Sequence, residues 1–184
     1  MAAVDLARCP WDKTSMKIKL VSLIVLSLVT STAFAAEKVT LSGVHNCCKK
    51  CTDGLNNAIA TAPGVTATIE KTTVTLSGAS TADLQKAVDA ITAAGYTGTS
   101  DSDKVKVNAG TAADEKVTTL TVTGTHLCCG KCVTAAEKAI KSVKGVKSDT
   151  CTKGVETFKV EGNFNAKELM AALDKAGFTG TVAK

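Results

Sequence analysis

The sequence predicts an α+β protein made of two copies of one βαββαβ unit. Three observations lead to this prediction: a cysteine motif that occurs twice, a similar order of apolar patterns after each copy, and a polar stretch between the copies. The motif reads HNCCKKC at 45–51 and HLCCGKC at 126–132, so corresponding residues are 81 apart. AGYTGT at 94–99 and AGFTGT at 176–181 repeat at an offset of 82. Self-similarity at a nearly fixed spacing indicates an internal duplication.

The first copy predicts each element of the unit in turn. KVTLSG at 38–43 is rich in β-formers and ends in glycine, which is typical of a strand. After the cysteine motif, which is expected as a loop, Leu55 and Ile59 are spaced as on one face of a helix. Two short strands at 65–70 and 73–76 follow, then a second helix that carries Leu84, Val88 and Ile91, with Ser80 or Thr81 as its N-cap.

The second copy repeats this order. A strand at 116–124 precedes the second motif, and the next helix carries an apolar stripe from Val133 to Val143. Strands at 146–151 and 156–160 lead to a last helix, which Asn165 would cap. The order βαββαβ in both copies is the split βαβ, or ferredoxin-like, arrangement. We therefore expect two ferredoxin-like sandwiches in tandem.

The predicted boundaries follow from these copies. The first unit spans 36–99, the second spans 116–184, and 100–115 is a polar linker. If flexible, these sixteen residues span roughly 20–24 Å. The two units are therefore free to meet or to share a partner.

Residues 1–35 are predicted to be an N-terminal extension and a secretory signal peptide. Lys17 and Lys19 precede an apolar run at 20–29, and Ala33-Phe34-Ala35 supplies a cleavage site. The run is too short for a stable membrane span, which needs roughly 20 apolar residues. We expect a periplasmic or secreted protein without a membrane span after cleavage. Translation from Met1 and translation from Met16 both remain open.

The composition argues against several classes of function. Residues 36–184 carry 18 basic and 15 acidic side chains, a net charge of +3, and contain no basic run. A nucleic-acid partner is therefore not expected. The chain has two histidines, each inside a cysteine motif, and no evident acidic pair, so we do not expect an enzyme.

The two motifs carry the chemistry that the sequence predicts. Thiolates are the metal-binding form of cysteine, and a helix start favours them. Several sulfurs so close in sequence suit soft ions such as Cu(I), Hg(II) or Zn(II). A histidine in each motif is a candidate further ligand. The candidate ligands are His45, Cys47, Cys48 and Cys51 in the first copy, and His126, Cys128, Cys129 and Cys132 in the second.

A Cys-x-x-Cys after the first strand of a βαββαβ unit resembles the heavy-metal-associated domain, a family that includes copper chaperones and periplasmic mercury-binding proteins. The resemblance implies that Cys48 and Cys51, and likewise Cys129 and Cys132, are the metal ligands. It also implies a metal transporter or another metal-binding domain as partner. Tyr96 and Phe178 fall where the family often places a tyrosine beside the metal loop. The family motif methionine is absent, and the loop is two residues longer than usual.

The sequence leaves several alternatives open. One alternative concerns the residues outside the two Cys-x-x-Cys pairs, which either ligate the metal or only lie next to a two-sulfur site. These residues are Cys47, Cys128 and the two histidines. Cys151 is a buried core thiol or joins the second site. The leading function is an exported soft-metal-binding chaperone, scavenger or sensor with exposed ligands on two separate sites. The alternatives are a thiol–disulfide redox protein that uses the Cys-x-x-Cys pairs, and an interaction module with structural zinc.

Overall fold

The computed structural model describes residues 36–183, and these belong to one compact unit. The predicted extension and signal peptide, 1–35, lie outside the described residues. Among the helices of 36–183, none is both long enough and apolar enough to span a membrane.

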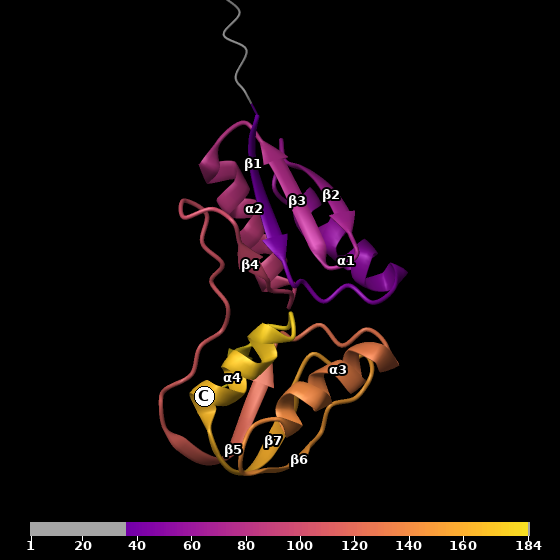
Figure 1. The fold of residues 1–184 in the computed structure, drawn as a ribbon. Coiled ribbons are helices and arrows are strands. Elements are labelled where there is room, and N and C mark those ends of the chain that lie inside the picture. Colours follow the sequence, from indigo (N-terminus) through magenta and orange to yellow (C-terminus); the bar gives the residue numbers. More distant parts are fainter. Residues whose placement is uncertain (1–35, 184) are drawn as a thin grey trace, which may run out of the picture. The chain divides into compact units, whose positions relative to one another are not determined.

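Residues 36–183 form two four-stranded antiparallel sheets and four helices, arranged as Figure 1 shows. The first half contains β1 (Glu37–Ser42), α1 (Lys49–Ala60), β2 (Thr66–Glu70), β3 (Thr73–Gly78), α2 (Thr81–Ala93) and β4 (Thr99–Ser100). The second contains β5 (Lys116–Thr123), α3 (Gly130–Lys141), β6 (Val146–Asp149), β7 (Phe158–Asn165), α4 (Ala166–Lys175) and β8 (Thr181–Val182). The strand orders are β2-β3-β1-β4 and β6-β7-β5-β8, so each half has the predicted split βαβ topology.

Each half buries one face of its sheet against its two helices. In the first half, Val39 and Leu41 of β1 are buried and pair with Leu76 and Val74 of β3. In the second half the position equivalent to Val74 is Phe158, which pairs with Val122 of β5. The first core is therefore mostly aliphatic, whereas the second contains larger aromatic side chains.

The predicted helix caps agree with the structure, while several strand limits differ. Ser80 and Asn165 are N-caps, and each side chain accepts a hydrogen bond from the backbone N–H three residues further on, of Asp83 and of Glu168. β7 runs on to Asn165, five residues beyond the predicted end, because it continues to pair with β5. β6 ends at Asp149, two residues before the predicted end, so Cys151 lies just beyond the strand instead of in it.

The segment 101–115 contains no helix or strand, but it is attached to both halves rather than free. Gln85 of α2 hydrogen-bonds to both the N–H and the carbonyl of Lys106, and Val105 is buried. The N–H of Gly110 donates to Thr179, and Asp114 accepts from Asn165. These contacts tie the segment to both halves, while the predicted linker and the division into two domains stay predictions.

Candidate metal centre

Both cysteine motifs lie where a loop turns into a helix. Cys48 is the N-cap of α1 and Cys129 is the N-cap of α3, both with extended backbones. Cys51 and Cys132 lie one turn further on and are fully buried. The second and third cysteines of each motif are thus part of the helix start, not of a free loop. Each start offers backbone N–H groups and a positive dipole end to the sulfurs.

Each motif loop is fixed to the hairpin of its own half. In the first half, Asn46 donates to the carbonyl of Lys71 and accepts from Thr52. In the second half the equivalent residue is Leu127, which is buried and whose carbonyl accepts from Gly154 N–H. The first loop is therefore held by side-chain hydrogen bonds of Asn46, and the second by a backbone hydrogen bond and the buried Leu127 side chain.

The two repeated AG(Y/F)TGT segments pair with each other. Tyr96 and Phe178 form an antiparallel bridge, and the N–H of Thr97 and of Thr179 each donates to the opposite glycine carbonyl, Gly177 and Gly95. Both glycines have a positive φ, +85° and +82°. A Cβ on either would lie within about 2.5 Å of backbone atoms of the opposite motif loop. Only glycine allows this close approach.

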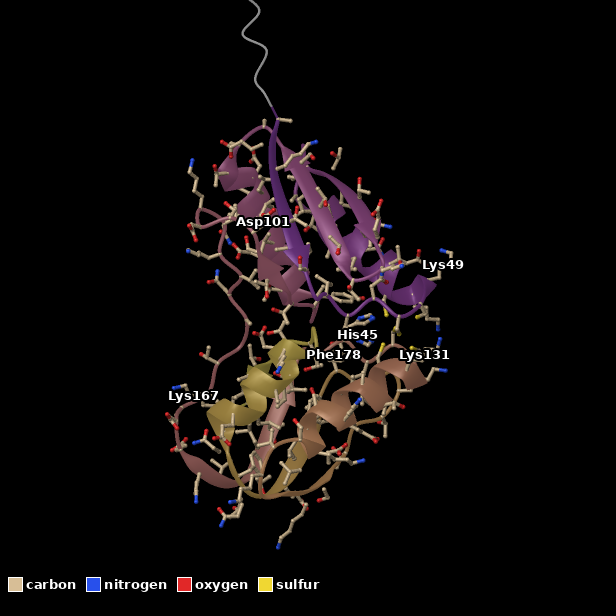
Figure 2. The ribbon with its side chains drawn as sticks, viewed as in Figure 1. His45, Lys49, Asp101, Lys131, Lys167 and Phe178 are labelled. Carbon is tan, nitrogen blue, oxygen red and sulfur yellow. The ribbon has the colours of Figure 1, made fainter. Side chains whose placement is uncertain are left out.

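The bridge places each aromatic ring on the histidine of the other half. The His45 and Phe178 rings, which Figure 2 labels, stack at 4.2 Å between centroids. The Tyr96 and His126 rings stack at 4.4 Å. The Tyr96 hydroxyl also donates to the Cys51 carbonyl at 3.1 Å. Tyr96 and Phe178 are both buried, so they are core residues that also border the cysteine motifs.

This pairing brings all six motif sulfurs together. Sulfurs of opposite motifs approach within 3.5–3.8 Å, as in Cys47–Cys129, Cys47–Cys132, Cys48–Cys129, Cys51–Cys128 and Cys51–Cys132. Four pairs within one motif are equally close, at 3.5–3.8 Å, for example Cys129–Cys132 at 3.5 Å. The expectation of two separate sites with exposed ligands is therefore wrong for this arrangement: four of these cysteines are half-buried and two are fully buried.

The two histidines differ in their relation to the sulfurs. A ring nitrogen of His45 lies within 4.8 Å of the Cys47 and Cys132 sulfurs, in a group suited to hold an ion. His126 belongs to no such group among the described residues. Nε2 of each histidine is buried without a hydrogen-bond partner. Burial lowers the pKa of both imidazoles, which favours the neutral form that ligates metals.

The metal-free sulfurs are unequal in acidity. Interaction with the backbone N–H of Cys132 lowers the pKa of the Cys129 thiol to about 6. Burial raises the pKa of Cys128 to about 12, and burial also raises that of Cys47. Thiolates this close repel one another, so only some ionise at neutral pH without a cation. A metal ion would supply the missing positive charge and displace the remaining protons.

Cys151 is buried and lies in none of the metal-suited groups of the described residues. Burial raises the pKa of its thiol. This agrees with the buried core thiol that the sequence favoured. None of the described cysteines forms a disulfide.

Sequence reasoning missed the residues that join the two motifs, namely Gly95, Gly177 and the crossed aromatic–histidine stacks. The signal was available as the repeated hexapeptide, but nothing in one sequence says that its two copies pair with each other. Gly54 was also missed. A Cβ there would lie 2.4 Å from the Tyr96 hydroxyl.

No family model matches the chain, and no curated protein matches it. Among solved structures, the chain is similar to the N-terminal soluble domains of Bacillus subtilis CopA, determined in solution. The identity is 20%, the match covers 81% of this chain and 95% of that one, and the TM-score is 0.29. A likeness at that identity and TM-score does not decide what this chain binds.

Proposed function

We propose that this protein is exported and binds soft metal ions at the paired cysteine motifs, as a carrier or scavenger. One observation carries the proposal: six thiol sulfurs lie within 3.5–3.8 Å of their neighbours. A metal–thiolate bond is about 2.3 Å long, so sulfurs that share one ion lie about 3.8–4.0 Å apart. The sulfurs are therefore already spaced for a shared ion. The sequence motif supports the same chemistry through its resemblance to heavy-metal-associated domains.

The surroundings favour ions that prefer sulfur. Hard ions such as Mg²⁺ or Ca²⁺ need oxygen ligands, whereas the groups here offer sulfur and one imidazole nitrogen. Lys49 and Lys131 stand at the two helix starts (Figure 2), and Lys49 pairs with Asp53 at 2.8 Å. Their positive charge adds to that of the helix ends and offsets part of the charge of a thiolate cluster.

Transfer would begin at the half-buried cysteines. Cys47, Cys48, Cys128 and Cys129 are half-buried, whereas Cys51 and Cys132 are closed off. A thiolate of a partner protein, such as a metal transporter or another metal-binding domain, would replace these accessible sulfurs first. The export part of the proposal rests on the signal-like pattern at 16–35. Fractionation of cells that express the tagged full chain checks it, since the proposal requires the processed protein outside the cytoplasm.

The test of binding is an anaerobic titration of the purified, reduced protein with Cu(I), Hg(II), Zn(II) and Cd(II). We expect tight, stoichiometric uptake, thiolate-to-metal charge-transfer absorbance, and release of protons. Replacement of Cys48, Cys51, Cys129 and Cys132 by serine should remove tight uptake, while Cys151→Ser should leave it unchanged. Uptake of none of these ions would contradict the proposal.

A thiol–disulfide redox role is the second candidate, because Cys129 is acidified and lies 3.5 Å from Cys132. It requires a reversible dithiol–disulfide couple near the potentials of exchange catalysts and catalysis of insulin reduction. Tight stoichiometric metal uptake without such catalysis favours the metal role. Structural zinc is distinguished by circular dichroism, because in that case a chelator would unfold the protein.

A further inference from the structure

The positions of the six sulfurs specify more than a general soft-metal site. Besides the pairs at 3.5–3.8 Å, the metal-suited groups place Cys47–Cys48, Cys48–Cys128 and Cys128–Cys129 within 4.8 Å. Together with the shorter pairs these are the edges of an octahedron. Its opposite corners are Cys47 and Cys128, Cys48 and Cys132, and Cys51 and Cys129.

An octahedron has two sets of four alternating faces, and one set contains all three metal-suited groups of cysteines. The fourth face of that set has all three edges at 3.7–3.8 Å. No two of these faces share an edge, and every sulfur belongs to two of them. The faces are Cys47–Cys48–Cys129, Cys48–Cys51–Cys128, Cys128–Cys129–Cys132 and Cys47–Cys51–Cys132.

We infer that the two motifs form one shared site for four Cu(I) ions, one on each of these faces, with every thiolate bridging two ions. The inference rests on the proposed function and specifies its stoichiometry, metal and geometry. It differs from two independent sites of one ion each, because three of the four triangles combine sulfurs of both motifs and the fourth lies within the second motif alone.

Charge and coordination number favour Cu(I) among the soft ions. Six thiolates and four monovalent ions leave a formal charge of −2, which the two helix N-termini and nearby lysines can offset. Zinc requires four ligands, and six bridging sulfurs provide only three for each of four ions. Zn(II) should therefore bind in smaller number than Cu(I). Cu(I) is also among the ions that soft thiolate ligands select.

The interface explains why the cluster would form within one chain. Tyr96 pairs with Phe178, and Gly95 and Gly177 allow each segment to contact the opposite motif loop. These contacts are hydrogen bonds and ring stacks that do not involve the sulfurs, so the octahedron is held by groups other than its own ligands. Such preorganisation strengthens binding, because less ordering remains when the ions enter.

The experiment titrates the reduced protein with Cu(I) against a competing chelator, and measures native mass spectra and copper X-ray absorption. We expect one chain to take up four copper ions cooperatively, with few partly filled species and a copper–copper scattering path. Saturation at one or two ions without that path would overturn the shared cluster and leave soft-metal binding intact. A four-copper species found only in a dimer of chains would also overturn it. No uptake would overturn both proposals.

A pair of glycine variants tests the role of the interface. Gly95→Ala places a methyl group about 2.5 Å from the Gly124 carbonyl and the His126 nitrogen, whereas at Gly64 the same methyl group would meet nothing within 4 Å. Both have φ above +80°, so both substitutions carry a similar backbone strain. We expect Gly95→Ala to lose the copper–copper path and Gly64→Ala to keep four ions. If both variants fold and have the same copper content and the same copper–copper path, the inference is contradicted. If Gly95→Ala does not fold, the copper titration of the wild-type protein decides whether the four-ion cluster forms.

Discussion

The two halves of the chain repeat one motif but support it differently. In the first half Tyr96 reaches the Cys51 carbonyl, and the helix position facing its hydroxyl is Gly54. In the second half the equivalents are Phe178, which has no hydroxyl, and Ala135. The candidate ligands are thus identical in the two halves, whereas these two residues beside them have changed as a pair. The comparison indicates that the cysteines and histidines of the motif are needed in both halves, whereas the side chains that pack beside the motif can differ.

The largest expected effect comes from removing the equivalent sulfurs Cys47 and Cys128 together. They are opposite corners of the octahedron, so the double variant Cys47→Ser, Cys128→Ser leaves no complete three-sulfur face. Both Cys-x-x-Cys pairs remain. We expect the copper content to fall from four ions to two and the copper–copper path to disappear in X-ray absorption.

The matched control is Cys151→Ser, which should keep four ions because Cys151 lies outside the cluster. Each single variant, Cys47→Ser or Cys128→Ser, should lose the same number of ions, since the sulfurs are shared. Unchanged stoichiometry in the double variant would show that these two cysteines are not ligands.

The second effect tests whether the halves are independent folding units. Val74 and Phe158 occupy equivalent buried positions in the two sheets. Phe158→Ala should lower the free energy of unfolding by about 3–5 kcal/mol, and Val74→Ala by roughly 2 kcal/mol, because less apolar surface is lost. Urea unfolding of the metal-free protein, followed by circular dichroism, measures both.

If the predicted domains fold independently, each substitution shifts only the transition of its own half. A single transition that both substitutions shift as a whole would instead show that the interface couples the halves. The linker contacts at Lys106 and Gly110 would then be part of that coupling.

Much of this fold follows from local patterns in the sequence. The caps Ser80 and Asn165, the glycine turns and the apolar stripes each act over a few residues, so one sequence is enough to predict them. The motif cysteines could be selected as candidate ligands for the same reason, since a helix start next to a Cys-x-x-Cys has a local physical meaning.

The arrangement of the two motifs could not be predicted in this way. It depends on Gly95 and Gly177 meeting backbone atoms of the motif loop in the opposite half, and on rings that cross from one half to the other. A linker long enough to let the halves meet does not fix which faces meet. The first half has Gly54 with Tyr96, and the second half has Ala135 with Phe178. This paired change indicates packing between the two positions, but within each half and not between the halves.

The third effect comes from exchanging this matched pair. Gly54→Ala alone places a methyl group 2.4 Å from the Tyr96 hydroxyl, and should cost about 1–3 kcal/mol by overpacking. Tyr96→Phe alone removes the hydrogen bond to Cys51 and should cost about 1 kcal/mol. The double variant copies the second half and should regain most of the loss, because alanine also favours the helix by about 1 kcal/mol over glycine.

A double-mutant cycle by urea unfolding measures this coupling. Strictly additive costs would show that the hydroxyl and the glycine do not constrain each other. Ala135→Gly is the control in the second half. It should cost only the helix propensity, since Phe178 has no hydroxyl to accommodate.

The smallest expected effect separates the two histidines, which the sequence treats as equivalent. Each can be replaced by phenylalanine, which retains a ring to stack on Phe178 or Tyr96 and removes the buried Nε2 that lacks a partner. Neither variant should therefore lose stability without metal, and either one gains slightly if the unpaired nitrogen is costly.

Their metal affinities should differ, because only His45 has a ring nitrogen near the Cys47 and Cys132 sulfurs. Those two sulfurs form one edge of the face that Cys51 completes, so the imidazole is placed to give that ion a fourth ligand or to orient it. His45→Phe should weaken binding of the last copper ion about tenfold, as loss of a neighbouring group around a metal commonly does. His126→Phe should leave it unchanged. Chelator competition at the final equivalent of Cu(I) measures both, and equal losses in the two variants would contradict a distinct role of His45 at that ion.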